Sequence, residues 1–301
     1  LINFSPLLSL YGNLQDDENF KLLIEDVCRY VEANPVKWMH MNFDRTEIFN
    51  RCEKNSLIQI FKVLYEIKAE MKGAGFWCCK SMANLYFISS IENENLQPYY
   101  IHLVRDGRDV AASFKRAIVG EKHIYYLALQ WEKEQAIASG VLKKFGDNRV
   151  SVVYFEQFID DPEKSLTPIL EKSGLKWNEN ILNYFTSEEA KNTAAAGEMW
   201  KNVALPVDNT NKKHYSEKLT GEEIEIFEKV AGKTLSQFGY ETNYALNNTI
   251  FTDAEIKYFE SENEKMKKQT KELLTKDAAL RIPQEKILAE IKARSSDNRK
   301  K

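Results

Sequence analysis

An apolar run that passes at once into a charged turn and a helical pattern constrains this chain more than any other stretch. The run Tyr99–Val104 is too short for a helix and is typical of a parallel strand buried on both faces. A charged turn, Asp106–Asp109, follows it, and the next residues predict a helix with Asp109 as N-cap and Ser113 in the first turn. A strand, a tight turn and a helix N-terminus present free backbone N–H groups where α/β sheets bind anions.

Two side chains at this junction could bind such an anion. Arg105 ends the strand and can hold a phosphate group through two parallel hydrogen bonds, and Ser113 can add a hydroxyl. The same charges are also compatible with a helix cap and surface ion pairs. The pattern alone leaves both interpretations open.

The string from Arg105 to Ser113, Arg-Asp-Gly-Arg-Asp-Val-Ala-Ala-Ser, resembles the 3′-phosphate-binding motif of the sulfotransferase family. Those enzymes use 3′-phosphoadenosine-5′-phosphosulfate (PAPS). The stretch Val152–Pro162 resembles a later strand and turn of the family, and Lys218–Tyr240 resembles its closing helix. Because the resemblance runs in order over roughly residues 76–241, it is more specific than a single motif.

The resemblance implies an α/β fold, a P-loop-type parallel sheet flanked by helices. It also implies transfer of a sulfuryl group from PAPS, as co-substrate, to a hydroxyl or amine acceptor without a metal. Arg105 and Ser113 would hold the 3′-phosphate, and Lys80 would face the transferred group. The polar stretch 186–219, expected to be a long ordered loop, would add Lys201 and Lys213 to the cofactor site.

The apolar residues Phe76–Cys79 predict a second buried strand that places Lys80 at its carboxyl end. An exposed lysine that caps a strand is the alternative. Relatives carry a general base, a glutamate directly before this lysine or a histidine two residues after it. Here Cys79 and Met82 occupy those positions, so the group that deprotonates the acceptor is unassigned.

The resemblance also implies a first strand that ends in a loop around the 5′-phosphosulfate, and no such loop follows a strand in this sequence. Its nearest counterpart, Lys172–Gly174, closes a helical pattern that begins near Pro162, where Gly174 is expected as the helix C-cap. We therefore expect the first strand to be absent from this chain. A sheet without it would expose apolar edges, so we expect poor solubility or association and impaired activity.

Local signals predict helices before and after this region. Asp16 or Asp17, Asp44 and Ser56 are the expected N-caps of the first helices. We predict a sulfotransferase-like domain over residues 1–242 and a charged helical tail over 243–301. The tail should start with a capping box at Thr252–Glu255, break at Pro283 and be disordered from Arg294. Its helix could dock on the domain, pair with a second copy in a homodimer, or be solvated, and the sequence leaves these alternatives open.

Composition limits the partners. The chain has 301 residues and a net charge of −3, so it has no global basic field for nucleic acid or an anionic membrane. The acceptor should be a small molecule, a lipid or a carbohydrate. No apolar run approaches the ~20 residues of a membrane span.

The four cysteines lack paired metal-ligand spacing, which is typical of reduced thiols in a cytoplasmic protein. His102 and His123 are expected to be structural.

Two other functions stay open. A non-catalytic nucleotide-binding or interaction protein on the same fold would explain Cys79, Met82 and the missing loop, with the tail as its docking element. A nucleotide kinase would require a Walker-type loop and magnesium.

Overall fold

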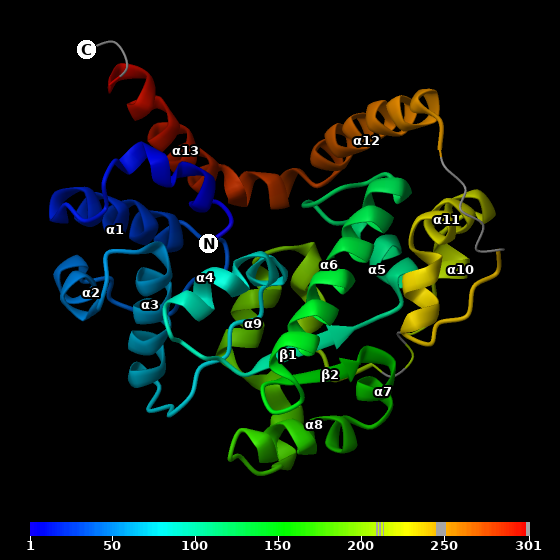
Figure 1. Ribbon diagram of the computed structural model, residues 1–301, viewed down its shortest axis with the longest axis horizontal. Coiled ribbons are helices and arrows are strands. Elements are labelled where there is room, and N and C mark those ends of the chain that lie inside the picture. The colour runs from blue at the N-terminus through cyan, green and yellow to red at the C-terminus, as the bar shows by residue number, and fades with distance from the viewer. Residues whose placement is uncertain (209, 211, 213, 245–250, 299–301) are drawn as a thin grey trace. The chain divides into compact units, whose positions relative to one another are not determined.

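The chain folds into two compact units, Leu1–Gln97 together with the chain from Ala279 onward, and Pro98–Ala278. The computed structural model describes residues 1–208, 210, 212, 214–244 and 251–298, and the side chains of 295–298 are outside this description. Figure 1 shows the two units in the colours of the chain. Neither unit boundary tests the predicted domain boundary at 242/243, which stays a prediction.

The first unit is helical in its described residues. Asp16, Asp44 and Ser56 cap α1, α2 and α3 by accepting backbone N–H groups, so these three predictions are confirmed. Its core consists of apolar side chains from α1–α3 and α13. The elements are η1 (Ser5–Tyr11), α1 (Asp17–Glu32), α2 (Arg45–Arg51), α3 (Leu57–Met71), η2 (Met82–Phe87), α4 (Ile88–Asn93) and most of α13 (Thr275–Asn298).

The predicted strand Phe76–Cys79 is wrong, because this segment has no regular secondary structure. Trp77 stacks on Tyr65 of α3 with 4.9 Å between ring centroids, and the Cys79 Sγ lies 3.0 Å from the Tyr65 hydroxyl. The Trp77 side chain therefore packs on helix α3 and not within a sheet. Phe76, with 65% of its surface exposed, has no comparable cover.

The second unit contains the parallel strands β1 (Tyr100–Val104) and β2 (Val150–Tyr154), paired from Tyr100↔Val150 to Val104↔Tyr154. They lie side by side in Figure 1, and α5 (Gly107–Phe114) and α6 (Ile124–Phe145) connect them. The expected α/β class with parallel strands is confirmed in a mostly helical form. Within the described residues the sheet has two strands.

Strand β1 was expected to be buried on both faces, and this expectation is wrong. Ile101 and Leu103 are 48% and 53% exposed, whereas Val104 is buried. Successive side chains leave a strand on opposite faces, and the described neighbours of β1 cover one face better than the other. The predicted poor solubility stays a prediction.

Helix α11 packs along α6 to form the core of the second unit, through Leu127, Trp131, Phe227 and Leu235. The capping box of α11 at Thr220 and Glu223 is present.

Gly174, with φ of 71°, follows the C-cap of α8, so Lys172–Gly174 ends a helix and forms no phosphate loop. The remaining elements are α7 (Phe155–Asp160), α8 (Pro162–Lys172), η3 (Glu179–Thr186), α9 (Glu188–Ala195), η4 (Glu198–Ala204), α10 (Tyr215–Lys218), α11 (Gly221–Gln237) and α12 (Asp253–Leu273).

The long loop expected over residues 186–219 instead contains three short helices, α9, η4 and α10. Ser187 caps α9 through the backbone N–H of Ala190, and Ala190 and Ala196 are buried. Small apolar residues therefore supply packing where the low content of large hydrophobic residues suggested a loop.

The tail differs from the prediction at two points. The Thr252–Glu255 capping box is confirmed, but Pro283 lies inside α13 and the helical path changes at Leu274 instead. A proline removes one backbone hydrogen bond, and burial of Ile287 and Ile291 in the next turns supports the helix beyond it. The disorder expected from Arg294 is wrong up to Asn298, since α13 extends that far. Residues 299–301 lie outside the described residues.

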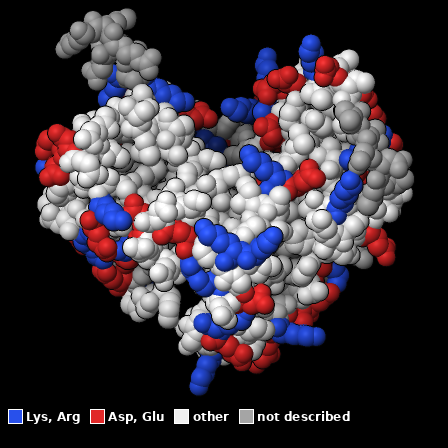
Figure 2. All heavy atoms as spheres, viewed as in Figure 1, with Lys and Arg blue, Asp and Glu red and all other residues white. Residues whose placement is uncertain are grey.

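The surface carries both signs of charge. Figure 2 shows basic and acidic side chains interspersed over the face in view, in line with the small net charge. In the described parts of the chain, no helix has the length and apolar composition that crossing a membrane requires.

Candidate functional site

Helix α5 begins three residues earlier than predicted. Asp106, not Asp109, is its N-cap, and the Asp106 carboxylate accepts the backbone N–H of Arg108 at 2.9 Å. Asp109 is buried in the first turn. Ser113 consequently lies in the last turn, exposed, rather than in the first. Either aspartate satisfies the local capping pattern, and packing of the turn decides between them.

Gly107 allows α5 to start directly against the core. A Cβ atom at this position would lie 2.6 Å from both the Phe227 and the Trp131 rings. Any side chain here would push α5 away from α6 and α11. The glycine of the motif is therefore required for close packing at the end of β1.

Arg108 lies in a buried ion network. Its guanidinium bonds Asp106 at 2.7 Å and Glu228 of α11 at 2.5 Å, and it lies 4.1 Å from the Tyr215 ring centroid. Burial opposes the charge of Arg108, but the two carboxylates prevail and raise its pKa. With 2% exposure for both Arg108 and Glu228, this cation fixes the turn and is not available to a ligand.

Glu156 at the start of α7 connects three parts of the unit. One oxygen accepts the backbone N–H of Asp106 at 3.1 Å, and the other accepts the hydroxyl of Tyr240 at 2.9 Å. Burial and the neighbouring Glu156 raise the pKa of Tyr240, which therefore remains a donor. The ends of β1, β2 and α11 are held together by this carboxylate.

Arg105 lies half-buried at the end of β1, with its guanidinium 4.4 Å above the ring centroid of Phe155. The aromatic ring orients the guanidinium, whose planar fork carries several N–H donors. The structure gives Phe155 the role of a platform for Arg105.

The Asp106 carboxylate caps α5 by accepting the backbone N–H of Arg108. That the N-terminal backbone of α5 binds an anion stays a prediction. Arg105 and Ser113 lie on one strand–turn–helix, separated by about two helical turns. A guanidinium and a hydroxyl are the donor set that a phosphate monoester accepts.

Two of the three predicted lysines lie in described parts of the chain other than β1 and α5. Lys80 is exposed, belongs to the first unit and follows the segment that was expected to be a strand. Lys201 is an exposed residue of η4, and its ammonium lies 2.9 Å from Glu198. Such a surface pair is weak and leaves the lysine able to change partners. Lys213 lies outside the described residues.

Both histidines make contacts that fit the expected structural roles. The Nε2 of His102 lies 2.9 Å from the Gln135 side-chain oxygen, and burial lowers its pKa. His123 is the N-cap of α6 and stacks on Phe259 of α12, with 4.6 Å between ring centroids.

Sequence reasoning missed Glu228, Glu156 and Tyr240, which hold the strand end in place. The dense charges of Arg-Asp-Gly-Arg-Asp were the available signal, since charges so close to a buried strand require partners. Nothing in the sequence identified those partners, because Arg108 and Glu228 are 120 residues apart.

Comparison with known proteins shows the family of this chain. The sequence pattern described as "Sulfotransferase family" matches residues 10–179, more than half of the chain. The matched range contains the β1–α5 junction, Arg105, Phe155 and Glu156. No curated protein matches the chain. The chain belongs to the sulfotransferase family.

Proposed function

We propose that this protein transfers a sulfuryl group from PAPS to a hydroxyl or amine acceptor. Family membership supports a sulfotransferase-type activity. The observation that carries the proposal is the Arg105 guanidinium, oriented by Phe155 at the carboxyl end of β1, eight residues before Ser113.

The residues at this junction fit the 3′-phosphate of PAPS. Arg105 would bind it through two N–H groups and Ser113 through its hydroxyl. Arg108 would keep the turn in place through Asp106 and Glu228 without touching the ligand. Lys201 and Lys213 are proposed as additional basic groups. PAPS supplies the activated sulfuryl group, and Lys80 is proposed to neutralise charge on that group.

The first test is calorimetric titration of residues 1–301 with 3′-phosphoadenosine 5′-phosphate, using 5′-AMP as the reference ligand. We expect tighter binding of the first ligand, and an Arg105→Ala variant should lose about 10- to 100-fold in its affinity. Arg105→Lys should recover part of the loss, since it keeps the charge but not the planar donor fork. Arg51→Ala, in the first unit, is the control and should bind as the wild type does.

Equal affinity of the wild type for both nucleotides would overturn the proposal. The same result would follow if Arg105→Ala kept the full preference for the 3′-phosphate. A melting curve of each variant separates loss of binding from loss of the fold.

One observation favours a second candidate, a nucleotide-binding protein without catalysis. The position directly before Lys80 holds Cys79, whose sulfur lies 3.0 Å from the Tyr65 hydroxyl and accepts from Asn84 at 3.2 Å. Transfer of radioactive sulfate from labelled PAPS to a panel of alcohols, carbohydrates and amines distinguishes the two. Selective nucleotide binding without transfer to any of them would favour the second candidate. Magnesium-dependent phosphoryl transfer would indicate a kinase.

A further inference from the structure

Within the second unit, helix α12 packs on the start of α6 through the apolar Phe259 and through one buried polar side chain, Asn263. Asn263 is 3% exposed, and its Oδ1 accepts the backbone N–H groups of Lys122 at 2.8 Å and His123 at 2.9 Å. Its Nδ2 donates to Glu121 at 2.5 Å. Lys267, one turn later, bonds the same Glu121 carboxylate at 2.7 Å. The helix thus holds residues 121–123, which lead into α6.

Lys122 extends this contact to the end of α5. The side chain is 1% exposed, and its Nζ lies 2.7–3.2 Å from the carbonyl oxygens of Phe114, Val119, Gly120 and Glu121. Phe114 is the last residue of α5 and follows Ser113 directly. The chain from Phe114 to Glu121 is therefore wrapped around one buried ammonium group, and Asn263 holds the backbone of the same lysine.

The first turn of α13 makes a second, independent contact. Asp277 is 7% exposed, and its two carboxylate oxygens accept the backbone N–H of Glu198 at 3.1 and 3.3 Å. Glu198 is the first residue of η4, and its N-cap, Gly197, has no side chain that could cap the helix. A Cβ at Gly197 would lie 3.1 Å from Asp277. Asp277 therefore caps, from a distant part of the chain, the element that carries Lys201.

We propose that α12 and the first turn of α13 support the nucleotide site, with Asn263 and Asp277 as positioning residues. Asn263 fixes the end of α5, which carries Ser113, and Asp277 fixes η4, which carries Lys201. The inference rests on the proposed function, because both segments are the ones assigned to the 3′-phosphate. Neither residue touches the ligand.

Asn263→Ala and Asp277→Ala test this proposal in the chain of 301 residues. Each should reduce the preference for 3′-phosphoadenosine 5′-phosphate over 5′-AMP by roughly tenfold. A general loss of stability would weaken both ligands equally, so the ratio of affinities reports positioning. Hydrogen exchange without ligand should accelerate at residues 115–123 in the first variant and at 198–204 in the second.

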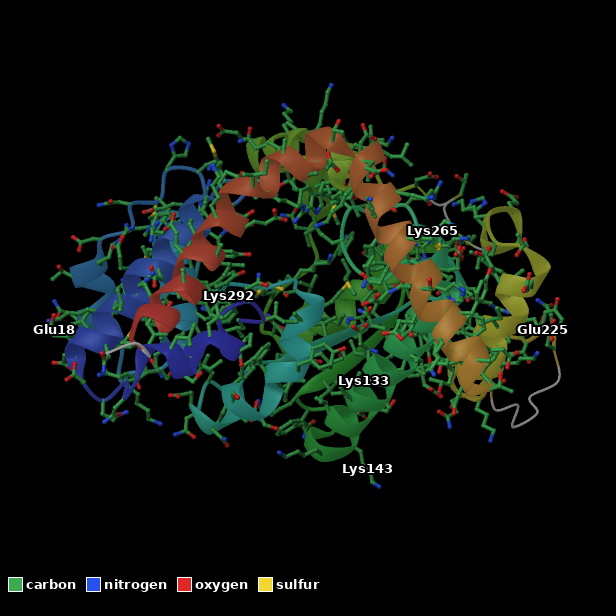
Figure 3. The ribbon with its side chains drawn as sticks, turned by 90° about the horizontal axis from the view of Figure 1, so that it is seen from above. Glu18, Lys133, Lys143, Glu225, Lys265 and Lys292 are labelled. Atoms are coloured by element: carbon green, nitrogen blue, oxygen red, sulfur yellow. The ribbon has the colours of Figure 1, made fainter. Side chains whose placement is uncertain are left out.

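Matched controls lie on the same helices. Lys265, on the exposed side of α12 (Figure 3), and Lys276, next to Asp277, should give wild-type ratios and exchange rates when changed to alanine. Asp277→Asn keeps one acceptor oxygen and should retain more preference than Asp277→Ala. This variant keeps the test decisive if the alanine variant unfolds.

The outcomes separate the two proposals. If the wild type discriminates between the nucleotides and the folded variants discriminate equally well, this inference is wrong and the proposed function stands. If the wild type does not discriminate, the proposed function is wrong. Unchanged exchange at 115–123 and at 198–204 in the variants would overturn the inference whatever the nucleotides do.

Discussion

The two units differ in what they bury. In the first unit the side chains of lowest exposure are apolar, such as Phe20, Leu23 and Ile60, and its buried charged residue among those described is Asp26. The buried Asp26 carboxylate accepts hydrogen bonds from the Tyr11 hydroxyl at 2.8 Å and from Arg294 at 2.6 Å. Several charged residues are buried in the second unit, namely Asp106, Arg108, Asp109, Lys122, Glu228 and Asp277.

Apolar burial and buried ion pairs contribute differently to a protein: the first mainly to stability, the second mainly to a defined geometry. Apolar contacts tolerate substitutions that keep shape and volume, because dispersion and burial have little directionality. A buried ion network is directional, and it contributes geometry more than net stability. The second unit therefore has the rigid polar framework that a site for a charged ligand requires, and the first unit mainly has an apolar core.

The largest effect should come from breaking the ion network. Glu228→Ala leaves Arg108 buried without one of its two carboxylates, and the unfolding free energy of the second unit should fall by about 3–5 kcal/mol. Urea denaturation followed by hydrogen exchange measures this loss. Glu225→Ala, on the exposed surface of α11 (Figure 3), removes the pair with Lys229 and should cost less than about 1 kcal/mol. Equal losses in the two variants would show that the buried ion network is no more important for stability than an exposed ion pair.

A core truncation in the first unit should reduce stability but not ligand preference. Leu23→Ala removes a fully buried side chain and should cost about 3 kcal/mol. The ratio of affinities for the two nucleotides should stay at the wild-type value in the variant that remains folded. Leu22→Ala, at the exposed neighbouring position, should change stability by less than about 0.5 kcal/mol. A changed nucleotide ratio in Leu23→Ala would show that the first unit shapes the site.

Adding one methyl group at the start of α5 should have an intermediate effect. Gly107→Ala places a Cβ against Trp131 and Phe227, and the overpacking should cost about 1–3 kcal/mol. It should also weaken nucleotide binding, which calorimetry measures. Gly140→Ala is the matched control, because its Cβ would meet open space within α6 and should stabilise the helix by up to about 1 kcal/mol. A neutral result at Gly107 would mean that α5 can move without cost.

The smallest expected effect is a dependence of stability on pH. Burial lowers the pKa of His102 in the folded chain, so the unfolded chain binds the proton more readily. The stabilising contribution of neutral His102 should be complete above the unfolded pKa of about 6.5 and decline as the pH falls below it. His102→Gln should lose less stability than the wild type between pH 7 and pH 5 in thermal unfolding. Identical acid sensitivity of both proteins would contradict this prediction.

Local signals in the sequence predicted the helices whose caps lie within a few residues of the backbone groups that they bond. The N-caps Asp16, Asp44 and Ser56 and the capping boxes at Thr220 and Thr252 bond backbone groups two or three residues away. A short apolar run predicted β1, the family resemblance predicted β2, and the motif from Arg105 to Ser113 indicated the family. These signals are local, so a single stretch of sequence contains all the partners involved.

Only the tertiary structure decided which charges are buried and which segments pair. In the structure Asp106, not Asp109, caps α5. Glu228 forms an ion pair with Arg108, and the Phe155 ring packs against the Arg105 guanidinium. Residues 76–79 lie outside the sheet, and α13 continues through Pro283. The reason is physical: the cost of burying a charge or leaving a strand unpaired depends on groups distant in the chain, and a local pattern does not contain them.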